Sequence, residues 1–115
     1  MKTVAPFTHL LADLIGVAPA HLRDARLLGG LLIAAASAAG LPAVGTPVVH
    51  QLPSDEVTGV LLLDASHIVL HSAPERGVML LDVLVGSARD PRVVLDVFVR
   101  RLVPRELRSE SRSRG

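Results

Sequence analysis

The sequence lacks several residue types that often carry chemistry or hold flat ligands. It has no cysteine, tryptophan or tyrosine, and its two aromatic side chains are Phe7 and Phe98. The absence of cysteine excludes a disulfide scaffold, a cysteine-ligated zinc or iron–sulfur site and a cysteine nucleophile. The scarcity of aromatic rings excludes a pocket that holds a flat ligand between several aromatic faces.

The chain also has almost no excess of positive or negative charge. Twelve Lys and Arg residues oppose eleven Asp and Glu residues, which leaves a formal net charge of +1. A protein that neutralises many phosphates needs a clear basic excess, so we expect no nucleic-acid partner. The chain has 115 residues, and half of them are hydrophobic. This length and composition predict one domain with a substantial core.

One uncharged segment, residues 27–49, is long enough to span a bilayer. It is nevertheless interrupted by four glycines and two prolines, and Gly40 followed by Pro42 is typical of a helix end. We therefore expect no membrane span. The N-terminus shows no signal peptide, so a cytoplasmic location is the expectation.

Hydrophobic spacing predicts an α+β domain over residues 1–103, followed by a disordered polar tail over 104–115. Strands are expected at 8–17, 46–52, 57–65, 67–72 and 78–85, and helices at 19–39 and after Asp90-Pro91. This order predicts a two-layer sandwich, in which a mainly antiparallel sheet of four to five strands carries two helices on one face. The uncovered face would be apolar, which favours a dimer.

The residues that could carry chemistry lie between Thr58 and Glu75. On a strand, His67 and His71 point to the same side. Two histidines and the hydroxyls of Thr58 and Ser66 are costly to bury in an apolar hairpin unless they are used, although surface histidines at a strand end would explain them equally well. The spacing favours neither a zinc site nor a Ser–His–acid triad, and we predict no metal.

Residues 57–77, with the pattern S-H-x-x-x-H-x-x-P-E-x-G from Ser66 to Gly77, resemble the core of the short prokaryotic S-adenosylmethionine decarboxylases. The resemblance extends over nearly the whole chain except the tail. In that family the chain cuts itself, and a serine becomes a pyruvoyl group. The resemblance places the cut between Ala65 and Ser66, so the covalent pyruvoyl cofactor would derive from Ser66. It implies that His71 is the processing base and that Thr58 assists processing.

The resemblance also implies a reaction. The pyruvoyl ketone forms a Schiff base with the substrate amine and accepts the electrons left by the departing carbon dioxide. The chain would then be a carboxy-lyase of polyamine (spermidine and putrescine) biosynthesis that acts on S-adenosylmethionine, as a homodimer of processed αβ protomers. Besides Ser66, His71 and Thr58, His67 is a candidate catalytic residue. Candidate substrate-binding residues are Leu52, Ala73, Glu75, Asp82 and Gly86.

Four positions depart from the family pattern. Ala65 replaces a glutamate, Gly86 stands where the family has a catalytic cysteine, and Leu52 and Ala73 stand where an aromatic pair stacks on adenine. These departures leave two alternatives open. One is a decarboxylase of L-ornithine or L-arginine, with Glu75, Asp82 or Asp64 holding the cationic end of the substrate. The other is an uncut, non-catalytic homologue that acts as a partner subunit.

Overall fold

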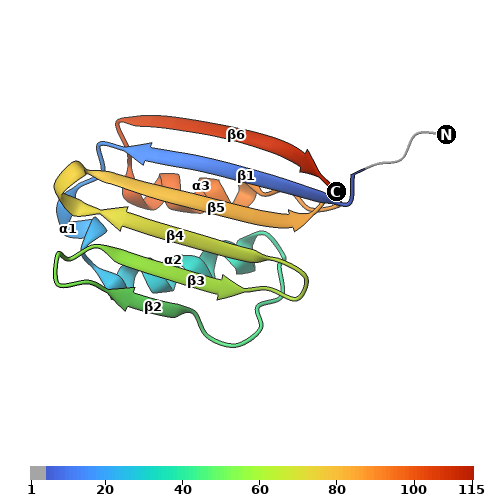
Figure 1. Cartoon of the computed structure of the whole chain (residues 1–115), viewed down its shortest axis with the longest axis horizontal. Coiled ribbons are helices and arrows are strands. Elements are labelled where there is room, and N and C mark those ends of the chain that lie inside the picture. Colours follow the sequence, from blue (N-terminus) through green and yellow to red (C-terminus); the bar gives the residue numbers. More distant parts are fainter. Residues whose placement is uncertain (1–4) are drawn as a thin grey trace.

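An antiparallel sheet forms one layer of the fold, and the helices form the other (Figure 1). The computed structural model describes residues 5–115. The six strands lie in the order β2-β3-β4-β5-β1-β6. They are β1 (Phe7–Ile15), β2 (Val48–Gln51), β3 (Val57–Leu62), β4 (His67–Ala73), β5 (Val78–Gly86) and β6 (Glu106–Arg114). The helices are α1 (Pro19–Leu22), α2 (Ala25–Ala38) and α3 (Arg92–Leu102), with a 3₁₀ turn, η1 (Pro74–Arg76).

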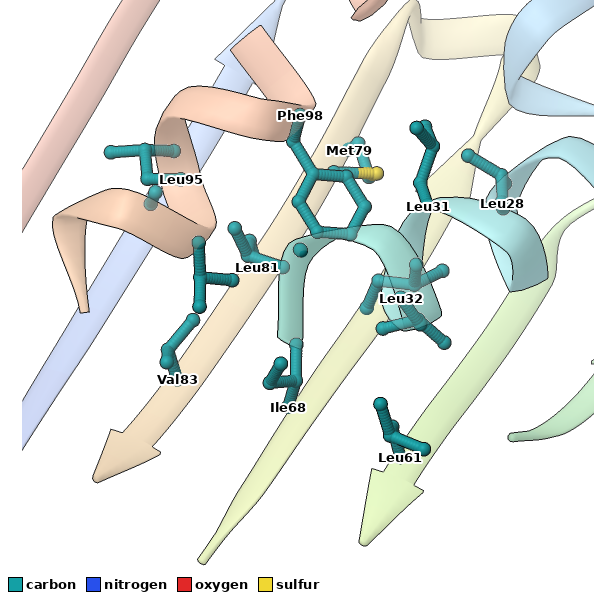
Figure 2. Packing of buried hydrophobic residues seen from close by; sticks show 14 of the residues in the cluster. Leu28, Leu31, Leu32, Leu61, Ile68, Met79, Leu81, Val83, Leu95 and Phe98 are labelled. Carbon is teal, nitrogen blue, oxygen red and sulfur yellow. The ribbon is translucent and has the colours of Figure 1, made fainter. Parts of the chain in front are cut away.

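The predicted α+β class and the one-sided placement of the helices are confirmed (Figure 1). The core lies between the two layers, because alternate side chains of each strand point toward the helices. Phe98 of α3 lies beside Met79 of β5, whereas Leu32 of α2 lies on the side of Ile68 of β4 (Figure 2), and all four side chains are buried. Burying one such side chain contributes about 1.5–3 kcal/mol.

Local capping divides the single helix predicted over residues 19–39 into α1 and α2. The Asp24 carboxylate accepts a hydrogen bond from the Leu27 N–H at 3.0 Å and caps the start of α2. The predicted start after Asp90-Pro91 is confirmed for α3, which begins at Arg92. The Asp90 carboxylate accepts from the Arg92 N–H at 3.0 Å.

The prediction of a disordered tail over residues 104–115 is wrong. Residues 106–114 form β6, which pairs along its full length with β1, so the sheet has six strands rather than four to five. Two neighbouring ion pairs on β6, Glu106 with Arg108 and Glu110 with Arg112, further order its polar side chains. The domain therefore continues beyond residue 103.

The face of the sheet opposite the helices has no covering layer within residues 5–115 (Figure 1). We call it the open face. It carries partly exposed apolar side chains at Phe7, Leu11, Val48, Leu62 and Leu80. Among residues 5–115, no helix combines the length and hydropathy needed to cross a bilayer.

Candidate functional site

The predicted site residues of the central strands gather on the open face. In β4 the side chains of Ile68, Leu70 and Ser72 are buried toward the helices, so His67 and His71 point the other way. The same alternation places Thr58 of β3, Ala73 of β4, and Asp82 and Gly86 of β5 on that face. The prediction that both histidines face the same side is confirmed.

His71 is the centre of one group of polar residues, the His71 cluster, formed with Thr58 and Glu56. Strand pairing places Thr58 opposite His71, and Thr58 Oγ1 lies 2.8 Å from His71 Nδ1. On the other side of the ring, Nε2 lies 3.1 Å from Glu56 Oε1. A carboxylate only accepts, so the neutral imidazole donates through Nε2 and accepts the Thr58 hydroxyl proton at Nδ1. Glu56 therefore orients the His71 ring so that its Nδ1 accepts the hydrogen bond from Thr58.

The charge state of Glu56 supports this assignment. The hydrogen bond from His71 lowers the pKa of the Glu56 carboxyl below its usual value, and a second hydrogen bond from Ser54 acts in the same direction. Glu56 is thus ionised at neutral pH and available as the acceptor of the His71 ring N–H.

A second group, the Asp82 cluster, contains His9, Asp82 and His67. His9 and His67 lie on the two strands that flank β5, and both pair with Leu84. Asp82 Oδ1 lies 2.7 Å from His9 Nε2 and 3.6 Å from His67 Nε2. The side chain of His9 is 15% exposed, whereas those of His67 and Asp82 are 36% and 38% exposed. One carboxylate thus serves two imidazoles beside the predicted cleavage point.

Ser66 lies in the connection between β3 and β4, where the Leu63 N–H donates to the Ser66 carbonyl at 2.9 Å. This turn is at the same end of the sheet as the end of β5, opposite η1 (Figure 1). Ser66 and His71 are five residues apart on one extended segment, which corresponds to about 16 Å. The structure therefore does not bring Ser66 and His71 of one chain together.

Gly86 leaves space beside this turn. It follows Leu84 on the open face, and a Cβ atom added to it would meet nothing within 4 Å. Its direct partner on β1 is Phe7, which also lies on the open face.

The candidate substrate-binding residues separate into two places. Ala73 and Glu75 line a cavity of about 240 Å³ at the η1 end of the sheet, together with Ser54, Glu56, Pro74 and Arg76. Leu52 lies next to this cavity, since its N–H donates to the Glu56 carbonyl at 2.8 Å. Asp82 lies instead at the middle of β5, Gly86 lies at the other end of that strand, and Asp64 lies in the β3–β4 turn. Within one chain, Glu75 and Asp82 therefore do not share a pocket.

Two residues of these clusters, His9 and Glu56, and one that contacts them, Arg114, were not among the sequence candidates. Arg114 Nη1 lies 3.2 Å from His9 Nδ1. Each contact depends on pairing between strands, and no local motif marks it. The one signal in the sequence was a polar residue within each of two predicted apolar strands, His9 in one and Asp82 in the other.

Comparison with known proteins agrees with this arrangement. The chain matches the S-adenosylmethionine decarboxylase family over residues 8–115. It is 38% identical over 89 residues to an S-adenosylmethionine decarboxylase proenzyme of Symbiobacterium thermophilum, which covers 76% of this chain and 67% of the relative. It is 32% identical over 108 residues to the proenzyme of Brevibacillus brevis, covering 93% and 80% of the two chains.

A solved structure is similar over almost the full length. The crystal structure of the adenosylmethionine decarboxylase from Aquifex aeolicus superposes with a TM-score of 0.89 at 28% identity, covering 98% of this chain and 93% of that one. The sequence matches and the shared architecture agree with the resemblance drawn from the Ser66–Gly77 pattern. The chain belongs to the S-adenosylmethionine decarboxylase family, whose members are pyruvoyl-dependent decarboxylases.

Proposed function

We propose that the chain is a self-processing proenzyme that cuts itself between Ala65 and Ser66 and then decarboxylates S-adenosylmethionine for polyamine synthesis. The observation that carries the proposal is the His71 cluster. A hydroxyl, a histidine in a defined tautomer and a carboxylate lie in hydrogen-bonding order on the open face. The cytoplasmic location expected from the sequence remains a prediction.

The cut begins at the Ser66 hydroxyl. Its Oγ attacks the Ala65 carbonyl carbon, the C–N bond breaks, and the Ser66 nitrogen takes the hydroxyl proton, which converts the amide to an ester. Loss of the Ser66 Cα proton then expels the ester oxygen. The resulting enamine tautomerises to an imine, and water replaces its nitrogen with oxygen, which releases ammonia. These proton transfers need a nearby base, the role proposed for His71 with Thr58 as the relaying hydroxyl.

The separation of Ser66 and His71 implies two copies of the chain. Five residues of strand hold them about 16 Å apart, too far for proton transfer. Suppose that a second copy packs its open face against that of the first, rotated so that the two ends of the sheet are exchanged. Its His71 cluster would then lie over Ser66 of the first copy. The exposed apolar side chains of that face, Leu11, Leu62 and Leu80, would be buried by the same contact. We therefore propose a homodimer whose sites each combine both chains.

When formed, the pyruvoyl group supplies an electron sink for the pair of electrons left by carbon dioxide. The chain's own residues supply the surroundings. In the proposed dimer, the cavity lined by Glu56 and Glu75 lies beside the His71 cluster that faces the partner's residue 66. Its carboxylates suit a substrate with a positive charge beyond its amine. Ala73 and Leu52 offer an apolar but not aromatic contact.

Intact mass of the purified protein tests the proposal. We expect two fragments, 1–65 and an α chain beginning at residue 66 with a blocked N-terminus, and one uncut chain for Ser66→Ala. The matched control Ser87→Ala changes a serine outside both clusters and should cleave normally. A wild-type chain that stays whole would overturn the proposal and favour the non-catalytic homologue.

Release of labelled carbon dioxide identifies the substrate. We expect release from carboxyl-labelled S-adenosylmethionine by the wild-type protein and none by Ser66→Ala. Release from L-ornithine or L-arginine alone would overturn the assigned substrate while leaving the pyruvoyl chemistry in place.

A further inference from the structure

We infer that the His67 imidazolium, held by Asp82, donates the proton that completes each decarboxylation. The inference rests on the proposed function and addresses a step to which the self-cleavage chemistry assigned to the His71 cluster gives no acid. After carbon dioxide leaves, the substrate carbon must gain a proton. A positioned acid contributes about 10²- to 10⁴-fold to such a step. Gly86 carries no side chain and cannot supply one.

The location of His67 makes it the best-placed proton donor. It directly follows Ser66, lies on the open face, and is only partly exposed, at 36% of its side chain. Gly86 lies beyond Leu84, the residue opposite His67, and leaves open space on that side. An imidazole in this place can therefore turn toward a substrate carbon bound at residue 66, with no side chain at position 86 in its way.

Arg114 determines which ring nitrogen of His9 donates a hydrogen bond, and therefore how His9 contacts the Asp82 carboxylate. A guanidinium only donates hydrogen bonds, so the contact of Arg114 Nη1 with His9 Nδ1 makes that nitrogen the acceptor. A neutral His9 then carries its hydrogen on Nε2 and donates it to Asp82 Oδ1 at 2.7 Å. His9 orients Asp82 without neutralising its charge. The remaining negative charge faces His67 Nε2 at 3.6 Å, a distance suited to an ion pair with the protonated ring.

The proton transfer is balanced. The substrate carbon forms a C–H bond with the electron pair left by carbon dioxide, while an N–H bond of the His67 imidazolium breaks and its electrons stay on the ring nitrogen. Solvent returns the proton before the next turnover. His67 is the catalytic residue, and Asp82, His9 and Arg114 act as positioning residues.

Misplaced protonation gives a readout independent of rate. If the proton adds instead to the carbon of residue 66, hydrolysis releases an aldehyde and leaves the substrate nitrogen on the protein, as an N-terminal alanine. This end group has a free amine and a different mass from the pyruvoyl group. Its accumulation per turnover therefore reports how well the acid reaches the substrate carbon, whereas a purely structural defect would not change it.

The experiment compares full-length wild type, His67→Gln and Asp82→Asn with a matched control, His21→Gln, whose histidine lies on α1 beyond the other face of the sheet. We expect all four to cleave, which intact mass verifies. Turnover should fall about 10²-fold or more in His67→Gln, and alanine ends should accumulate in both cluster variants but not in the control. Wild-type turnover and end groups in His67→Gln would overturn the inference.

A thiol at position 86 provides a second variant. No atom lies within 4 Å of a Cβ placed there, and the backbone does not require glycine, so Gly86→Cys should fold. We expect His67→Gln/Gly86→Cys to recover turnover and lose the alanine ends, and failure to recover either would contradict the assignment. An uncut wild-type chain would instead overturn the proposed function itself, so the two failures are distinguishable.

Discussion

A mixture of two inactive variants tests whether each site takes Ser66 and His71 from different chains. Ser66→Ala cannot form the ester, and His71→Ala lacks the proposed base, so each should remain uncut when produced alone. Because about 16 Å of strand separates the two residues within one chain, a mixed dimer should contain one complete site. That site combines Ser66 of the His71→Ala chain with His71 of the Ser66→Ala chain.

The expected yield follows from random assembly. With equal production of both chains, about half of all dimers are mixed, and each mixed dimer cuts its His71→Ala chain. About half of the His71→Ala chains, or about a quarter of all chains, should therefore be cleaved. Separate affinity tags of different mass on the two chains allow intact mass spectrometry to read each population.

The matched control replaces the Ser66→Ala partner by a Ser66→Ala/His71→Ala double variant, which supplies no His71 and should give no cleavage. An uncut mixture would refute the two-chain site. Cleavage of His71→Ala produced alone would refute the assignment of His71 as the base.

Three further predictions address the His71 cluster, the core and the cavity. In His71→Ala, the pKa of the Glu56 carboxyl should rise toward its usual value, because the hydrogen bond from His71 is the largest cause of its lowering; carboxyl NMR titration measures it, and an unchanged pKa would contradict the contact. Ser72→Ala should lower the free energy of unfolding in urea by about 1–3 kcal/mol, since a buried backbone N–H and C=O both lose their partner. Leu52→Phe/Ala73→Trp should lower the KM for S-adenosylmethionine by about tenfold, since one base stack contributes about 1–3 kcal/mol; an unchanged KM would show that these positions do not face adenine.

Much of the site's scaffold could be predicted because it depends on local patterns. Alternation along residues 67–73 was sufficient to place both histidines on one face. Proline at 74 and glycine at 77 are typical of a turn between two strands, and Gly77 adopts the left-handed conformation with φ of +66°. The start of α3 after Asp90 was predicted in the same way. In each case, the residues that determine the structure are neighbours in the sequence.

The parts that could not be predicted depend on distant pairing. Residues 106–114 are polar, and their composition favours disorder. They form a strand because β1, whose paired residues lie about a hundred positions earlier in the sequence, offers a free edge for backbone hydrogen bonds. The contact of Arg114 with His9 exists only in that register. Glu56 lies before β3 and gains its role only when β4 brings His71 beside it.

The energetic weakness of the two clusters is itself an argument for function. The side chains of the His67–Asp82 and His71–Glu56 pairs are 36–38% exposed, and ion pairs open to solvent contribute about 0–1 kcal/mol to stability. If the open face is covered by a second copy, the polar groups also lose hydration, which apolar side chains would avoid. Apolar side chains such as that of Leu80 at these positions would therefore stabilise the fold and the dimer more than the polar groups do. Under the proposed function, proton transfer at the interface between two copies explains why Glu56, His71, Asp82 and His67 are titratable rather than apolar.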